Sequence, residues 1–240
     1  MTMKRLAALM LAAVMLLATL AGCGGPDSSV PGGSVTPLNP GGNADSTNPT
    51  ANDKPLSLGR LEGGVYANKY IGIACKLDES WTFYSAEELQ ELPDMVGDMF
   101  EGSQLGDAMK DMEQIMDMQA ECADDLTTMN IVYQKLSMTE RLSYATMSDE
   151  QIVDTTLQQR DMLEEAYSQA GITVKSMEKK TVTFLGEERA AIYTVAEIQG
   201  IAYYILQLHD YHLGSYGVTI TVGSYVQDKT ASLLELFYAL

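Results

Sequence analysis

Two histidines flank an aspartate near the end of the chain, in the segment LHDYHLG at 208–214. Imidazole nitrogens and a carboxylate are ligands that Zn²⁺ accepts, and the same groups transfer protons in enzymes. His209 and His212 are therefore the candidate metal ligands, and an enzymatic role would centre on them together with Asp210. We expect the segment at the end of a hairpin, where two imidazoles need not converge, and so favour polar turn residues over a metal site.

Recognised catalytic motifs are missing from the sequence. It contains no G-x-S-x-G nucleophile, no Walker loop, no G-x-G-x-x-G turn and no H-E-x-x-H pair. We therefore predict a protein without catalytic residues or a cofactor.

Methionines and acids alternate around an expected amphipathic helix over 105–120. Thioethers bind Cu(I), but Met109, Met112 and Met116 share the apolar stripe of this helix, so we expect them in the core. The acids fall on the other side, and no D-x-D-x-D-G calcium loop is present. We expect these acids, which include Asp117, to form a solvated surface.

Cys75 and Cys122 are the two thiols of the region after residue 57. Outside the cytoplasm they could form one disulfide, and the alternative is two separately buried cysteines that pack as small apolar groups. We favour the separate cysteines, because sequence alone does not bring the two Cα atoms within bonding distance.

The third cysteine, Cys23, follows a short export-type segment. Lys4 and Arg5 precede an apolar run over 6–20, which is shorter than the ~20 residues of a membrane-spanning helix. The following LAGC at 20–23 resembles the lipobox of bacterial lipoproteins. The resemblance implies cleavage between Gly22 and Cys23 and diacylglycerol on the Cys23 thiol. The chain would then be held at the extracytoplasmic face of the cell membrane; the alternative is a secretory signal with an incidental cysteine.

Residues 23–57 are almost wholly Gly, Pro, Ser, Thr, Asn and Asp, a composition typical of a disordered linker. The expected organisation is thus a signal peptide at 1–22, a lipidated linker at 23–57 and one domain at 58–240. Losing Lys4 and Arg5 with the signal changes the formal net charge from −18 to −20. Such an acidic chain repels phosphates, so we exclude nucleic acid as a partner.

The domain begins with two expected strands, 65–69 and 72–77, and an acidic turn before Trp81. The segment VYANKYIGIACKLDESWTFYS is similar to the PsbP-like family, whose members carry Y-x-N-x-x-x-G-I followed by P-x-x-W. Tyr66, Asn68, Gly72 and Ile73 match the first motif, whereas the proline of the second is missing before Trp81. The resemblance implies a PsbP-like fold and docking onto larger membrane complexes, and it carries no catalytic motif.

The remaining pattern predicts strands and helices in alternation. Ser148 and Gln151 predict a capping box that begins a helix ending at Gly171. Within this helix Arg160 lies near the apolar face and must either snorkel or find an acid partner, and we favour snorkelling. Strands are expected at 126–136, 172–185, 189–198, 201–208 and 216–222, with turns at Gly186-Glu187 and Gln199-Gly200. A closing helix is expected at 229–240, with Leu233, Leu234 and Phe237 facing inward. This order predicts an α+β fold: an antiparallel meander of about six to seven strands covered by helices.

Tyrosines are concentrated in the last strands, and aromatic side chains on a sheet can seat a sugar or a peptide. We favour core positions for them, with the adjacent Tyr203 and Tyr204 on opposite faces; the others are Tyr211, Tyr216 and Tyr225. Together the sequence predicts a membrane-anchored, non-catalytic binding or assembly module, with a protein partner in a membrane or wall complex. A solute- or metal-binding lipoprotein is the alternative, followed by an envelope enzyme.

Overall fold

The computed structural model describes residues 55–99 and 113–240, apart from the side chains of residues 94–99. The expected signal peptide, Gly22, Cys23 and nearly all of the linker lie outside these residues and stay predictions. The described part is an antiparallel α+β structure, as predicted, but it is built on two sheets rather than the one that was expected. No helix in this part of the chain is long and apolar enough to cross a membrane.

The smaller sheet joins the beginning and the end of the described chain. Its strands are β1 (Arg60–Glu62), β2 (Val65–Asn68), β3 (Ile73–Lys76) and β11 (Phe237–Ala239). They are hydrogen-bonded in that order, so the last strand of the chain pairs with β3.

The larger sheet has seven strands, which include the predicted meander. They are β4 (Trp81–Phe83), β5 (Gln114–Cys122), β6 (Thr127–Lys135), β7 (Ile172–Phe184), β8 (Glu187–Ile198), β9 (Ile201–Leu213) and β10 (Tyr216–Tyr225). Their order is β4-β5-β6-β10-β9-β8-β7, so β10 connects the meander to the earlier strands by pairing with β6.

Two tight turns set the register of the meander. Leu185 and Gly186 have φ values of 53° and 86°, and Gln199 and Gly200 have φ values of 51° and 84°. Two consecutive residues with positive φ form the turn that matches the twist of a hairpin, and glycine at the second position carries no steric penalty there. The turn predicted at Gln199-Gly200 is confirmed, whereas the turn predicted at Gly186-Glu187 lies one residue earlier, because Glu187 already begins β8.

Helices fill the two long connections of the larger sheet. They are α2 (Ala86–Met99), α4 (Met138–Tyr144), α5 (Asp149–Leu157) and α6 (Arg160–Gln169), and the short α7 (Thr230–Leu234) follows the last long strand. The predicted capping box of Ser148 and Gln151 begins α5. The sequence analysis missed equivalent boxes at Ser85 before α2 and at Ser137 before α4.

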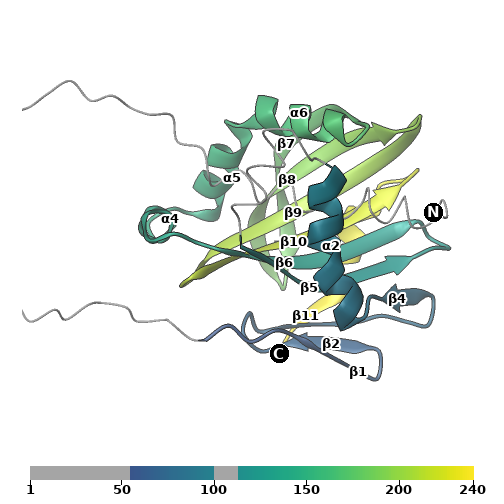
Figure 1. Ribbon diagram of the computed structural model, residues 1–240, viewed down its shortest axis with the longest axis horizontal. Helices are drawn as coiled ribbons and strands as arrows, with labels where there is room; N and C mark the ends of the chain where they lie inside the picture. Colours follow the sequence, from purple (N-terminus) through teal and green to yellow (C-terminus); the bar gives the residue numbers. More distant parts are fainter. Residues whose placement is uncertain (1–54, 100–112) are drawn as a thin grey trace, which may run out of the picture.

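The larger sheet is covered on both faces (Figure 1). On one face, Val153 of α5 and Leu163 of α6 pack with Ile192 and Ile205 of the sheet. On the other face, the smaller sheet and α7 pack against the larger sheet, with Cys75 in the shared core. On the helical face α5 and α6 lie mainly over β7, β8 and β9, and α2 packs mainly against β5.

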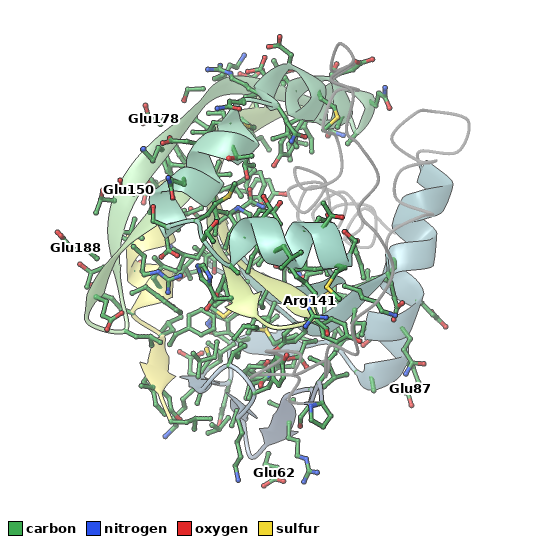
Figure 2. All side chains as sticks on the ribbon, turned by 90° about the vertical axis from the view of Figure 1, so that its left-hand side faces the viewer. Glu62, Glu87, Arg141, Glu150, Glu178 and Glu188 are labelled. Carbon is green, nitrogen blue, oxygen red and sulfur yellow. The ribbon has the colours of Figure 1, made fainter. Side chains whose placement is uncertain are left out.

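Acidic side chains project outward from many elements of the described part (Figure 2). The labelled examples Glu62, Glu87, Glu150, Glu178 and Glu188 are exposed and lie on different elements around the molecule. The negative charge is thus spread over the surface rather than confined to one patch.

The predicted helix over 105–120 is wrong from residue 114 onward, where the chain forms β5. Both faces of β5 are buried, Met116 on the helical side and Met118 between the sheets. A strand buried on both faces has no apolar–polar alternation, and its apolar residues happened to fit a helical period. Residues 105–112, with Met109 and Met112, lie outside the described residues.

The predicted closing helix is also wrong in its second half. The chain leaves α7 after Leu234 and forms β11, which pairs with β3. Leu233, Leu234 and Phe237 are buried as predicted, but a strand at Phe237 also pairs its backbone with the otherwise open edge of β3.

The predicted single helix from Ser148 to Gly171 is interrupted at Gln158 and Gln159, between α5 and α6. Just after the break, Arg160 donates from Nε to Glu164 at 2.6 Å, one turn along α6. Its side chain is therefore held by an acid partner rather than extended freely toward solvent, the alternative that the sequence analysis had not favoured.

Candidate functional site

The two histidines do not form a site together. Both lie within β9 rather than in a turn, and an odd spacing of three residues places their side chains on opposite faces of the strand. His209 is buried and His212 is exposed, with the backbone N–H of His212 donating to Asp210. Within residues 55–99 and 113–240, no three metal-ligating side chains are grouped closely enough to hold an ion.

His209 is a neutral core residue. Its Nδ1 lies 3.2 Å from the hydroxyl of Thr219 and 3.3 Å from that of Tyr211. Burial lowers the pKa of His209 to about 4, with Asp149 opposing that shift. The imidazole is therefore uncharged at neutral pH, unlike the polar turn residue expected from the sequence.

The two described cysteines are free and buried, which confirms the favoured interpretation. The Sγ atom of Cys75 lies 3.7 Å from the sulfur of Met129, in the core between the sheets. Burial raises the pKa of the Cys75 thiol to about 12, so the thiol is protonated and unreactive.

The tyrosines of the last strands are mainly core residues, as predicted. Tyr203 and Tyr211 are buried, and Tyr203 stacks on Tyr225 with ring centroids 4.4 Å apart. A Cβ atom on Gly223 would lie 2.4 Å from the Tyr203 hydroxyl, so the ring is seated on a strand position without a side chain. Tyr204 is partly exposed on the opposite face.

A cleft lies between α2 and β5. β4 pairs with only Ala120, Cys122 and the residue between them, so the edge of β5 from Gln114 to Met118 carries no β4 partner. A cleft of about 440 Å³ is present there, within the size range of small-molecule sites. Its wall is mainly apolar, and polar side chains at its inner end come from β5.

Asp117 lies at this cleft because β5 bulges between Met116 and Met118. An extra residue in one strand re-aims a side chain, and here the Asp117 carboxylate turns toward β2 of the smaller sheet. It accepts hydrogen bonds from the Tyr66 hydroxyl at 2.5 Å, from Asn68 Nδ2 at 2.6 Å and from the backbone N–H of Gly59 at 2.8 Å. Burial raises the pKa of Asp117, and these hydrogen bonds oppose that rise. The acid expected on a solvated surface is instead buried and fully engaged.

Asn68 completes this group, which we call the Asp117 network (Asp117, Tyr66, Asn68 and Tyr133). Its Nδ2 also donates to the Tyr133 hydroxyl at 2.9 Å, and its Oδ1 accepts from the backbone N–H groups of Tyr70 and Ile71. The amide thereby links both sheets and the turn after β2. Tyr66 and Asn68 are the residues that carry the family resemblance.

A second set of buried polar side chains crosses the helical face of the larger sheet. We call it the polar row: Gln119 of β5, Asn130 of β6, Thr221 of β10 and Gln207 of β9. Each member is directly opposite the next in register, so all four point to the same face. Their side chains are 0–1% exposed.

The polar row differs from the Asp117 network in its hydrogen bonding. Most of its polar atoms have no hydrogen-bond partner in the described part of the chain. These are both amide atoms of Gln119 and of Asn130, the hydroxyl of Thr221 and Nε2 of Gln207. Each such buried group costs about 1–3 kcal/mol when left unpaired. Gln119 also lines the cleft, so one end of the row meets the opening beside α2.

Sequence reasoning missed both sets. The strand around Asn130 places polar Thr128, Asn130 and Gln134 on one face, interrupted by apolar Val132, and apolar Met129 and Ile131 on the other, which is close to the normal pattern of a half-exposed strand. The pattern identified the strand correctly, but it gives no sign that the polar face is buried. No known protein-family profile matches the sequence, and no curated protein sequence is significantly similar to it.

Proposed function

We propose that the protein is a membrane-anchored extracytoplasmic lipoprotein that acts as a non-catalytic binding module of the cell envelope. The LAGC segment ending at Cys23 supports the lipid anchor, and the Gly/Pro/Ser/Asn composition of 23–57 supports a flexible tether. The membrane is then one partner, through N-terminal diacylglycerol, and the folded part is presented to another.

The observation that carries the binding role is the cleft between α2 and β5. The cleft has a mainly apolar lining, and it contains the buried amide of Gln119, which has no hydrogen-bond partner among the described residues. Such groups are stabilised when something else supplies the hydrogen bonds. The volume of this cleft suits a small solute, so the solute-binding alternative has a specific structural argument.

We extend the proposal to a PsbP-like fold for residues 58–240, forming one domain. Tyr66 and Asn68 support this extension, because they match the first PsbP-like motif and their side chains join the two sheets through Asp117. The antiparallel sheet with helices on one face is compatible with that assignment.

The anchor is tested by replacing Cys23 with serine and fractionating cells fed with a labelled fatty acid. We expect the parent protein in the membrane fraction with label, and the Cys23→Ser protein unlabelled and either unprocessed or released. Label that persists on the variant would refute lipidation at Cys23.

The cleft is tested with a photo-crosslinking amino acid in the full-length protein in intact cells. Gln90 is exposed on α2 and lines the cleft, whereas Glu165 is exposed on α6 and serves as the matched control position. After irradiation, intact-mass spectrometry should show an adduct of discrete mass for position 90 and none for position 165. Equal reaction at both positions, or none at 90, would refute the cleft as the binding site.

A further inference from the structure

The polar row and the cleft together define a class of ligand. This inference rests on the proposed binding role and deepens it. We propose that Gln119 and Asn130 bind a neutral, hydroxyl-rich solute of about sugar size, which enters between α2 and β5.

The row offers hydrogen-bonding groups of both kinds. A primary amide carries two N–H donors and one carbonyl acceptor, and a hydroxyl both donates and accepts. Gln119 and Asn130 present both of their amide atoms without partners among the described residues, and Thr221 and Gln207 extend the same row inward. Sugar hydroxyls also donate and accept, so they match such a surface without leaving a group unpaired.

The charges nearby favour a neutral ligand. None of the four side chains in the row is ionisable, and the chain carries a formal net charge of −18, which disfavours anions. A cation would need a free carboxylate, but Asp117 at the cleft already accepts three hydrogen bonds, from Gly59, Tyr66 and Asn68. The Asp117 network thus removes the nearest buried charge from recognition.

The position of Gln119 connects the row to solvent. Its side chain is 1% exposed and lines the cleft, and Asn130 is its direct neighbour on β6. Tyr84, partly exposed, lies on the wall of the same cleft. An aromatic ring beside amide groups is a suitable surface for the apolar face of a sugar ring.

Binding is tested with the full-length processed protein in phospholipid nanodiscs, by calorimetry with glucose, N-acetylglucosamine, maltose and glycerol. We expect at least one of these neutral probes to bind with a Kd of ~1 mM or lower. Glucose 6-phosphate and glucosamine should bind at least about tenfold more weakly, because each carries an unpaired charge into the site.

Three variants locate the binding. Gln119→Leu and Thr221→Val each remove hydrogen-bonding groups of the row. Gln119→Leu should weaken binding by about tenfold or more, and Thr221→Val should weaken it by a smaller factor. Thr156→Val is the control, because Thr156 is also a buried threonine but donates to the backbone carbonyl of Ile152 within α5. It should leave the Kd unchanged.

Three outcomes would overturn this inference: none of the four neutral probes binds, a charged probe binds more tightly than the neutral ones, or Gln119→Leu leaves the Kd unchanged. The photo-crosslinking result separates the two proposals. An adduct at position 90 with no sugar binding would retain the binding module and reject its ligand class, whereas no adduct at 90 would reject the module itself.

Discussion

The two sets of buried polar side chains meet on β5, where Asp117 and Gln119 are two residues apart and differ in their hydrogen bonding. Asp117 is surrounded by donors that come from β2 and from the segment before β1. Gln119 has no partner for either amide atom among the described residues. Fully satisfied buried networks hold elements together, whereas unsatisfied ones lower stability and are expected where a ligand or water completes them. The first set therefore belongs to the architecture, and the second is available for function.

The largest effect should come from breaking the satisfied set. Asn68→Leu removes the amide that donates to Asp117 and Tyr133 and leaves the carboxylate less compensated in the core. We expect a loss of about 3–5 kcal/mol in the free energy of unfolding, as for a broken buried charge network. Urea unfolding followed by fluorescence of Trp81, the single tryptophan, measures this loss.

A loss below about 1 kcal/mol would contradict the role of the Asp117 network as the connection between the sheets. Tyr66→Phe serves as the graded control. It removes one hydrogen bond to Asp117 but keeps the ring against Gly59, where a Cβ atom would lie only 2.2 Å away. Its loss should be smaller than that of Asn68→Leu.

Acidification should affect the two faces of the sheet in opposite directions. His209, on the helical face, has a folded-state pKa of about 4, below the unfolded value of 6.5. The unfolded state therefore binds more protons, and stability is lost as the pH falls from about 6.5 to 4, by about 3 kcal/mol in total. The pKa of Asp117 is raised in the folded state, so the folded state binds a proton there before the unfolded state does. This contribution stabilises the fold as the pH falls toward the unfolded-state pKa of 3.8.

Urea unfolding at pH 7 and pH 4.5 compares these contributions. His209→Gln should lose less stability between the two pH values than the parent protein, and Asp117→Asn should lose more. If His209→Gln shows the parent pH dependence, His209 is not the neutral core residue that its burial indicates.

The burial and hydrogen bonding that cause these effects could not be predicted from the sequence, although much of the fold could. Period-two alternation predicted the strand at Tyr216–Val222, and the turn at Gln199-Gly200 was predicted from its residue types. Both signals are local. The burial of Asn130 depends instead on which elements lie over the sheet, and an alternating strand has the same pattern whether its polar face meets water or an enclosed site.

The wrong helix at 105–120 has a related cause. β5 is buried between the helices and the smaller sheet, so it lost the alternation that identifies a strand. The bulge at Asp117 then broke its register, and no local pattern predicts that an acid will be buried there. The candidate site was missed because it is built on the one long strand that the sequence analysis assigned to a helix.

A smaller effect should come from substitution of Gly223, which lies two residues from Thr221 on β10 and on the same, helical face of the sheet. Gly223→Ala would place a methyl group 2.4 Å from the Tyr203 hydroxyl, and Tyr203 is held by its stacking on Tyr225. We expect a loss of about 1–3 kcal/mol from overpacking, measured by urea unfolding. Adding Tyr203→Phe removes the nearest atom and should restore part of that loss. If Gly223→Ala leaves the free energy of unfolding unchanged, this face is loosely packed. The unpaired groups beside it would then be a consequence of loose packing rather than a binding surface.

The smallest effect, and the one with the opposite sign, should come from Asn130→Leu. Leucine has the same branched arrangement of side-chain heavy atoms and lacks the two polar atoms that have no partner among the described residues, so no hydrogen bond is lost and their desolvation cost is removed. We expect the free energy of unfolding to stay the same or rise by up to about 1 kcal/mol, in the same urea measurement that detects the loss in Asn68→Leu. Both changes replace a fully buried asparagine by leucine, so their difference isolates hydrogen bonding from side-chain volume. A loss in Asn130→Leu comparable to that in Asn68→Leu would show that the polar row is satisfied in solution, and the contrast between a structural and a functional set of buried polar groups would no longer hold.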